Sequence, residues 1–125
     1  MDANARQRVL DRFLKAFMAR DFAALADCVT ADFEWRFAIG PDAPDGKVYR
    51  GLDGLRQGFA ERDAALSAVR YDDLRTTVAG ERLVLEYRVS GTDRAGKSFN
   101  LRGVELFDFA GTRIAIKDVF WKQTA

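Results

Sequence analysis

The second half of the chain alternates apolar stretches with short glycine-containing turns, and this pattern constrains the fold more than any other feature. From Tyr71 onward, strand-like segments are separated by the turns AGER at 79–82, GTDRAGK at 91–97 and AGTR at 110–113. Turns of this kind join neighbouring antiparallel strands. The pattern therefore predicts a meander of long antiparallel strands in the C-terminal half.

The first half shows helical spacing instead. Apolar residues between Val9 and Met18 recur three and four positions apart, which predicts an amphipathic helix ending near Arg20. The other expected elements are a helix at 22–29, a strand at 32–40, a proline-containing loop at 41–46, a short strand at 47–49 and a third helix carrying Leu52, Leu55 and Phe59. Helices followed by a meander form an α+β domain whose helices cover one face of the sheet.

We therefore predict an α+β barrel, in which a cone-shaped, curved mixed or antiparallel β-sheet wraps around about three N-terminal helices. A chain of 125 residues with 48% hydrophobic residues fits one domain, which we expect to span residues 1–125. A curved sheet covered by helices leaves a conical hollow, and small ligands bind in hollows of this kind.

Composition excludes several classes of partner and chemistry. The 20 basic and 19 acidic residues are interspersed, so the chain lacks the basic stripe that a nucleic-acid partner would require. No apolar stretch approaches the roughly 20 residues of a membrane helix, and the single cysteine, Cys28, suits a cytoplasmic protein. Without histidine, and with one cysteine, imidazole and thiolate sites lack their ligands, so we expect no metal and no cofactor.

A glutamate interrupts an apolar row in FNLRGVELFDFAG at 99–111. On a strand, one face of this stretch holds Phe99, Leu101, Gly103, Glu105, Phe107 and Phe109. A carboxylate removed from water must be paired, protonated or solvated by a cavity. We predict that Glu105 points into the hollow and, partly protonated, donates a hydrogen bond to a ligand oxygen. The alternative is a strand position that reaches solvent or bonds to a neighbouring side chain.

Asp118 repeats this pattern in the last strand, where Ile114, Ile116 and Phe120 are its apolar row mates. If this row faces the hollow, two carboxyl groups enter an aromatic cavity. Burial and an adjacent arginine would then shift their pKa values in opposite directions and give a proton donor and an acceptor. The alternative is a buried ion pair between Arg88 and Asp118 that only joins two strands.

Almost the whole chain resembles the nuclear-transport-factor-two-like (NTF2-like) superfamily, in particular its SnoaL-like branch of polyketide cyclases, ketosteroid isomerases and limonene epoxide hydrolases. The resemblance rests on VLDRFLKAFMARDFAALADCVTADFEW near the start, VYRGLDGLRQGF in the middle and GKSFNLRGVELFDFAGTRIAIKDVFW near the end. It implies an α+β barrel. It does not imply one reaction, because this superfamily supports unrelated chemistries and binding-only members on one scaffold.

Similarity to the epoxide hydrolases implies that Arg88 and Asp118 stand at the arginine and one aspartate of their site. Ser90 stands where the other aspartate should be, and Trp35 and Phe37 replace a tyrosine and an asparagine. Similarity to the ketosteroid isomerases makes Glu105 the counterpart of an aspartic acid that donates to the substrate oxyanion. The general base of those isomerases falls at or near Phe37, which cannot accept a proton, so neither catalytic set is complete.

Arg88 receives opposite predictions from pattern and resemblance. The strand RLVLEYRVS has Leu83, Leu85, Tyr87 and Val89 as its apolar row, which leaves Arg88 exposed, whereas the resemblance places Arg88 in the pocket. Both hold if a second subunit covers the outer face, since a strand buried on both faces need not alternate. We therefore expect a homodimer through the sheet.

Together these features predict a pocket for a small hydrophobic, oxygenated molecule and cofactor-free acid–base chemistry, such as isomerisation, cyclisation, dehydration or hydrolysis. Glu105 would be the donor, Asp118 the base or its organiser, and Arg88 the electrostatic clamp. The other expected wall residues are Trp35, Phe37, Tyr49, Phe59, Leu101, Phe107 and Phe120. The alternative is a non-catalytic ligand-binding or protein-interaction module of the same fold.

Overall fold

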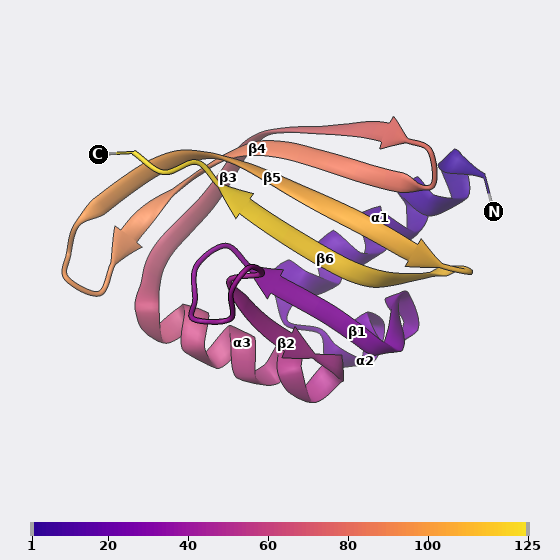
Figure 1. Ribbon diagram of the computed structural model, residues 1–125, viewed down its shortest axis with the longest axis horizontal. Helices are drawn as coiled ribbons and strands as arrows, with labels where there is room; N and C mark the ends of the chain where they lie inside the picture. Colours follow the sequence, from indigo (N-terminus) through magenta and orange to yellow (C-terminus); the bar gives the residue numbers. More distant parts are fainter. Residues whose placement is uncertain (1, 125) are drawn as a thin grey trace.

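The computed structural model describes residues 2–124, and in this range three helices pack on one face of a curved six-stranded sheet (Figure 1). In chain order the elements are α1 (Ala3–Ala19), α2 (Phe22–Cys28), β1 (Val29–Phe37), β2 (Lys47–Arg50), α3 (Gly51–Ala65), β3 (Leu66–Ala79), β4 (Arg82–Asp93), β5 (Ser98–Ala110) and β6 (Arg113–Trp121). The strands lie in the order β2-β1-β6-β5-β4-β3. All neighbours are antiparallel except β1 and β6, which are parallel. The predicted α+β architecture with a mixed sheet is confirmed.

Helix α1 is defined by its caps and its apolar face. The Asp2 carboxylate accepts a hydrogen bond from the Ala5 amide at 2.7 Å, and the helix ends at Arg20, which has a left-handed φ of 56°. Its buried residues are Val9, Leu10, Phe13, Ala16 and Phe17. None of the helices described in residues 2–124 is long and apolar enough to cross a membrane.

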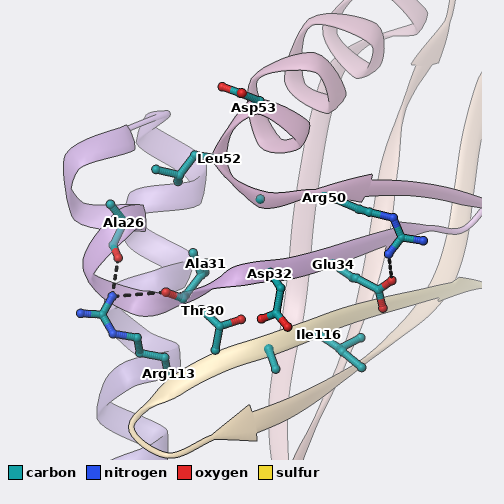
Figure 2. Close-up of a pocket in the computed structure, with 13 residues that line it drawn as sticks. Ala26, Thr30, Ala31, Asp32, Glu34, Arg50, Leu52, Asp53, Arg113 and Ile116 are labelled. Atoms are coloured by element: carbon teal, nitrogen blue, oxygen red, sulfur yellow. Dashed lines mark hydrogen bonds and ion pairs between the residues drawn. The ribbon is translucent and has the colours of Figure 1, made fainter.

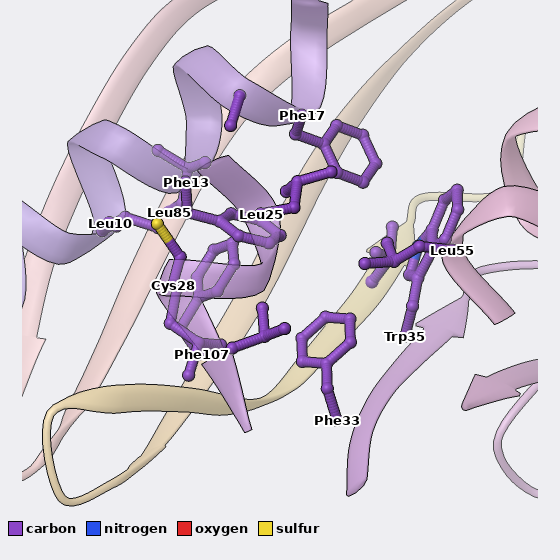
Figure 3. Packing of buried hydrophobic residues seen from close by; sticks show 14 of the residues in the cluster. Leu10, Phe13, Phe17, Leu25, Cys28, Phe33, Trp35, Leu55, Leu85 and Phe107 are labelled. Atoms are coloured by element: carbon purple, nitrogen blue, oxygen red, sulfur yellow. The ribbon is translucent and has the colours of Figure 1, made fainter. Parts of the chain in front are cut away.

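One part of the core lies where α1 and α2 cover the sheet (Figure 3). The Phe13 ring is fully buried, with its centroid 6.0 Å from that of Phe33 and 5.9 Å from that of Phe107. Leu10, Leu25 and Cys28 fill the space around these rings. This part of the sheet's inner face is therefore occupied by side chains of the protein itself.

A bulge in β6 decides which of its side chains face the helices. Asp108 of β5 pairs with Ile116, whereas its neighbour Phe109 pairs with Ile114, so Ala115 is an extra residue in β6. One extra residue exchanges the two faces of the strand beyond it. The residues of β6 that are buried are Ile114 before the bulge and Lys117, Val119 and Trp121 after it.

Strand β3 begins at Leu66, five residues before the strand start expected at Tyr71. Its backbone takes positive φ values at Ala68 and Asp73, and the ladder with β4 shifts beside each of them. These irregularities break the alternation of the strand's side chains. The sequence pattern therefore fails to show the first part of β3.

Candidate functional site

Glu105 is a buried carboxylate on the inner face of β5. Its relative exposure is 4%, and its row along the strand contains the buried Gly103 and Phe107. A Cβ atom at Gly103 would overlap the ring of Tyr87 on β4, so the glycine makes room for this ring beside Glu105. The predicted inward orientation of Glu105 is confirmed.

Two side chains from the neighbouring strands contact the carboxylate. In the ladders, Lys117 lies opposite Phe107 and Tyr87 lies opposite Gly103, so both are diagonal neighbours of Glu105. Lys117 Nζ is 3.1 Å from Glu105 Oε1, and the Tyr87 hydroxyl donates a hydrogen bond to Oε2 at 2.5 Å. Trp121 Nε1 donates to the Tyr87 oxygen at 3.1 Å. These four side chains form one buried polar network.

Both oxygens of Glu105 therefore accept hydrogen bonds. An ammonium group and a hydroxyl donor stabilise the ionised form of a carboxylate. This arrangement differs from the protonated, donating glutamate that the sequence suggested. The difference arises because Lys117 lies on the inner face, beyond the bulge of β6.

Lys117 is enclosed by rings and charges. Its relative exposure is 3%, and Nζ lies 4.6 Å from the ring centroid of Phe17 and 5.4 Å from that of Trp35. Burial lowers the pKa of the Lys117 amine, and the positive charges of Arg62 and Arg20 add to this effect, whereas Glu105 opposes it. The side chain thus has the environment of a lysine that gives up its proton more easily than a surface lysine.

A second polar pair borders the network. Arg62 of α3 donates to the Tyr71 hydroxyl at 2.5 Å, and the Tyr71 ring meets the Tyr87 ring edge-on, with centroids 5.0 Å apart. Burial raises the pKa of the Tyr71 hydroxyl, and burial together with the Glu105 charge raises that of Tyr87. Both hydroxyls therefore remain protonated hydrogen-bond donors at neutral pH.

A cavity of about 400 Å³ between α1 and β3 exposes this network, and we call it the α1–β3 cavity. Its lining residues are Leu14, Phe17, Met18, Val69, Arg70, Tyr71, Leu74, Leu85, Tyr87, Glu105 and Lys117. Most of this wall is apolar, with one carboxylate, one amine and two phenolic hydroxyls among its polar groups. Such a cavity suits a small apolar molecule with a few oxygen atoms.

A cavity of about 430 Å³ lies on the side of β2 and α3, and we call it the β2–α3 cavity. Of the expected wall residues, it contains Trp35, Phe37 and Tyr49; Trp121 of the polar network also lines it. The Tyr49 hydroxyl donates to Glu61 at 3.0 Å, and burial and this carboxylate raise its pKa to about 12. The polar network thus has residues in the walls of two cavities.

Asp118 and Phe120 do not face either cavity, which corrects the expectation from the sequence. Asp118 lies opposite Leu106 in the ladder, on the outer face of the sheet, where its carboxylate is 3.5 Å from the guanidinium of Arg36. Phe120 is 51% exposed. Burial raises the pKa of the Asp118 carboxyl, whereas Arg36 lowers it. The uninterrupted alternation assumed for β6 was wrong because Ala115 is bulged.

Arg88 also lies on the outer face. Its side chain is half exposed, and its guanidinium is 3.6 Å from Asp72 and 3.7 Å from Asp73. The strand pattern predicted this exposure correctly, whereas the placement of Arg88 in the pocket from the family resemblance was wrong. Within residues 2–124, Arg88 does not form the suggested ion pair with Asp118. Asp118 pairs with Arg36 instead.

The remaining expected wall residues belong to the packed interior. Phe59 and Phe107 are buried core residues, and Leu101 is partly buried against the core. Phe59 lies against Phe17, with ring centroids 4.7 Å apart. These three side chains shape the interior without lining either cavity.

Sequence reasoning missed Lys117 and Tyr87 as site residues. A signal for Lys117 was present, because Trp121 shares its row and a tryptophan at the end of a strand is more often inside than outside. Tyr87 was placed in the buried row of β4, but its partner could not be named without the register between β4 and β5. Within residues 2–124, no group of three or more acidic or cysteine side chains could hold a metal ion.

The largest depression, about 1020 Å³, is an open groove beside the start of β1 (Figure 2). Three of its charged side chains are engaged with each other or with the backbone: Arg50 pairs with Glu34, and Arg113 donates to the carbonyls of Ala26 and Val29. Asp32 and Asp53 also line the groove. Glu34 also binds Arg36, and these arginines lower its pKa although burial alone would raise it. This groove holds none of the buried network, and we place the candidate site in the α1–β3 cavity.

Three helices packed on a curved six-stranded mixed sheet match the NTF2-like fold. The sequence profile of the SnoaL-like domain family matches residues 10–116, and the chain belongs to this family. Comparison with curated protein sequences finds no significant match.

Solved structures share the fold across nearly the whole chain. An NTF2-like protein from Burkholderia xenovorans has a TM-score of 0.83 and 16% identity, covering 98% of this chain and 92% of its own. A protein with a ketosteroid isomerase-like fold from Catenulispora acidiphila, in complex with trimethylamine, has a TM-score of 0.70 and 16% identity, with coverages of 91% and 85%. TerC, co-crystallised with polyporic acid, has a TM-score of 0.76 and 17% identity, with coverages of 94% and 92%. At these identities the comparison shows the fold.

Proposed function

We propose that the protein binds a small hydrophobic, oxygenated molecule in the α1–β3 cavity and moves a proton on it without a cofactor. The observation that carries this proposal is the buried Glu105–Lys117–Tyr87 cluster in the wall of an otherwise apolar cavity. Its volume of about 400 Å³ lies within the range of small-molecule sites, about 300–1,000 Å³. Small molecules bound to two proteins of the same fold are consistent with this use of the scaffold.

Each group of the cluster has a role that its position supports. Glu105 is held by Lys117 and Tyr87 and would remove a proton from carbon next to a carbonyl group. Lys117 would stabilise the negative charge that then develops on the carbonyl oxygen, because a cation acts strongly in a site from which water is excluded. Tyr87 donates to Glu105 and holds the carboxylate in place. Isomerisation and cyclisation both begin with such a proton removal.

Asp118 and Arg88 have no part in this mechanism. Both lie on the outer face of the sheet, and neither lines the α1–β3 cavity. The catalytic roles that the sequence suggested for them are replaced in this proposal by Lys117 and Tyr87.

The proposal is tested by the exchange of α-hydrogens of 2-tetralone in D₂O, followed by proton NMR. Wild-type protein should accelerate the exchange over Glu105→Gln by roughly tenfold or more, since general bases contribute factors of about 10²–10⁴ on their own substrates. Asp118→Asn removes a carboxylate from the outer face of the same sheet and should exchange like the wild type. Equal rates for the wild type and Glu105→Gln would contradict the proposed base.

A binding-only protein is the second candidate, and one observation favours it. Both oxygens of Glu105 already have partners, so the network is satisfied without a ligand. In that case the cavity holds a ligand that no group of the protein alters. Binding of 2-tetralone without exchange of its α-hydrogens would support this second candidate.

We also propose that the outer face of the sheet forms a homodimer. In the strand ladders, Val104 lies opposite Phe120, and Val84 lies opposite Leu106, which gives an apolar patch across β4, β5 and β6. Phe120, on β6, is 51% exposed in this patch. Charged pairs such as Arg82–Asp108 and Arg75–Glu86 border the patch, as in the polar rim of an interface.

A further inference from the structure

We propose that Lys117 captures an aldehyde or ketone group of the ligand as an imine, so that the substrate class of this site is a hydrophobic carbonyl compound. This inference rests on the proposed function, because it requires that the α1–β3 cavity accepts a ligand. It goes beyond that function by assigning Lys117 a covalent role. The support is the combination of a buried amine, an adjacent proton acceptor and an apolar cavity wall around them.

The position of the amine meets the first requirement of imine formation, which is an unprotonated nitrogen that a ligand can reach. Lys117 lines the α1–β3 cavity together with Phe17 and Tyr87, and its Nζ lies 4.6 Å from the ring centroid of Phe17. Glu105 Oε1, at 3.1 Å, can take up the proton of the ammonium group directly. Lysines that lose their proton in apolar pockets are effective nucleophiles toward carbonyl groups.

Burial and the nearby positive charges favour the neutral amine, whereas Glu105 favours the ammonium form and can accept its proton. Arg62 on α3 and Arg20 after α1 place positive charge near Lys117, while Glu105 on β5 is the negative group in contact with it. Tyr87 on β4 bonds to Glu105, and Tyr71 on β3 is held by Arg62. Burial lowers the pKa of the amine in this setting. A proton released by Lys117 therefore stays within the cluster, on Glu105.

The reaction steps balance with these groups alone. Lys117 gives one proton to Glu105, and its nitrogen lone pair attacks the carbonyl carbon while the carbon–oxygen π electrons move to oxygen. That oxygen takes the second proton of the nitrogen, which yields a carbinolamine. Glu105 then returns its proton to the hydroxyl group, water leaves, and the nitrogen lone pair forms the C=N⁺ bond. The net change is an ammonium and a carbonyl converted into a protonated imine and one water.

Imine formation would also strengthen the proposed proton removal. The positive nitrogen draws electrons from the neighbouring carbon and makes its hydrogens more acidic. Glu105 is ionised again at this stage and lies beside the imine nitrogen. The same carboxylate would then remove the α-proton, and hydrolysis by water would free Lys117 at the end of the reaction.

The test is reductive trapping of wild-type protein with 2-tetralone and sodium cyanoborohydride at pH 7, followed by intact-mass and peptide mass spectrometry. Hydride addition to the imine gives a stable amine with a mass gain equal to the ketone less one oxygen atom. We expect one addition, on the peptide containing Lys117, while the exposed Lys15, Lys97 and Lys122 serve as internal controls with little label. Glu105→Gln should reduce the labelling of Lys117 by roughly tenfold, because the group that returns a proton to the carbinolamine hydroxyl and allows water to leave is lost.

Labelling of the exposed lysines without Lys117 would overturn the inference. Accelerated α-hydrogen exchange of 2-tetralone without any trapped adduct would also overturn it, and in that case the proposed function would stand with Lys117 as a non-covalent partner. If the ketone neither exchanges, nor is trapped, nor binds, the proposed function fails together with the inference. Because peptide mapping on the wild-type protein decides the outcome, a poorly folded variant does not affect it.

Discussion

Glu105→Gln removes the negative charge beside Lys117 while keeping the size of the side chain. Lys117 is 3% exposed, and its ammonium group would be left in an apolar cavity wall with Arg62 and Arg20 nearby. Removal of one partner from a buried ion pair costs about 3–5 kcal/mol of stability. Release of the lysine proton at pH 7 has a similar cost of about 5 kcal/mol, because the ordinary lysine pKa is 10.5 and each pH unit corresponds to about 1.4 kcal/mol.

The sign of the pH dependence follows from these costs. In the variant, folded Lys117 is neutral, whereas in the unfolded chain it is protonated below pH 10.5, so the unfolded state binds more protons. The free energy of unfolding of the variant should therefore rise with pH, by up to about 1.4 kcal/mol per unit between pH 7 and 9. The wild type should show a smaller rise, because Glu105 opposes the lowering of the Lys117 pKa.

Urea unfolding followed by tryptophan fluorescence at several pH values measures the difference. Asp118→Asn is the matched control, since its pair with Arg36 is 20–25% exposed on the outer face and should contribute no more than about 1 kcal/mol. The double variant Glu105→Leu with Lys117→Met removes both charges and should recover most of the lost stability. A Glu105→Gln variant that is as stable as the wild type, or whose stability loss does not change with pH, would refute this account of the network.

Two further predictions concern packing and assembly. Gly103→Ala should cost about 1–3 kcal/mol in thermal or urea unfolding, because the added Cβ would overlap the Tyr87 ring; a neutral effect would show that this ring has room to move. Phe120→Asp should convert a dimer into a monomer in analytical ultracentrifugation, because it places a charge in the outer apolar patch, and a wild-type protein that is already monomeric would rule out the proposed interface.

The sequence was sufficient for the architecture because each half of the chain has a clear period. Helical spacing marks α1, and the three glycine turns separate β3 to β6 at their actual junctions. Alternation also placed Glu105 inside and Arg88 outside correctly. Local sequence patterns therefore predict the order of the helices, the antiparallel meander and which side chains of a regular strand point inward.

These patterns could not predict which residues form the site, for two physical reasons. The bulge at Ala115 changes the facing of the rest of β6, so Asp118 and Lys117 exchange places relative to a regular strand. The contacts of Glu105 with Lys117 and Tyr87 are diagonal pairs across two strand boundaries, and they depend on register. The register leaves no signal within a single strand, and the only sign of the bulge in β6 is Trp121 in the row of Lys117.

The most direct test of the central claim is methyl NMR of the protein titrated with 2-tetralone. The wall of the α1–β3 cavity contains Leu14, Val69, Leu74 and Leu85, whereas Leu106, Val104 and Ile116 lie on the outer face. We predict that the ketone shifts the methyl signals of the first group and leaves those of the second group unchanged. Shifts confined to the outer face, or to the groove beside Leu52 and Ile116, would contradict the placement of the ligand site beside Glu105 and Lys117.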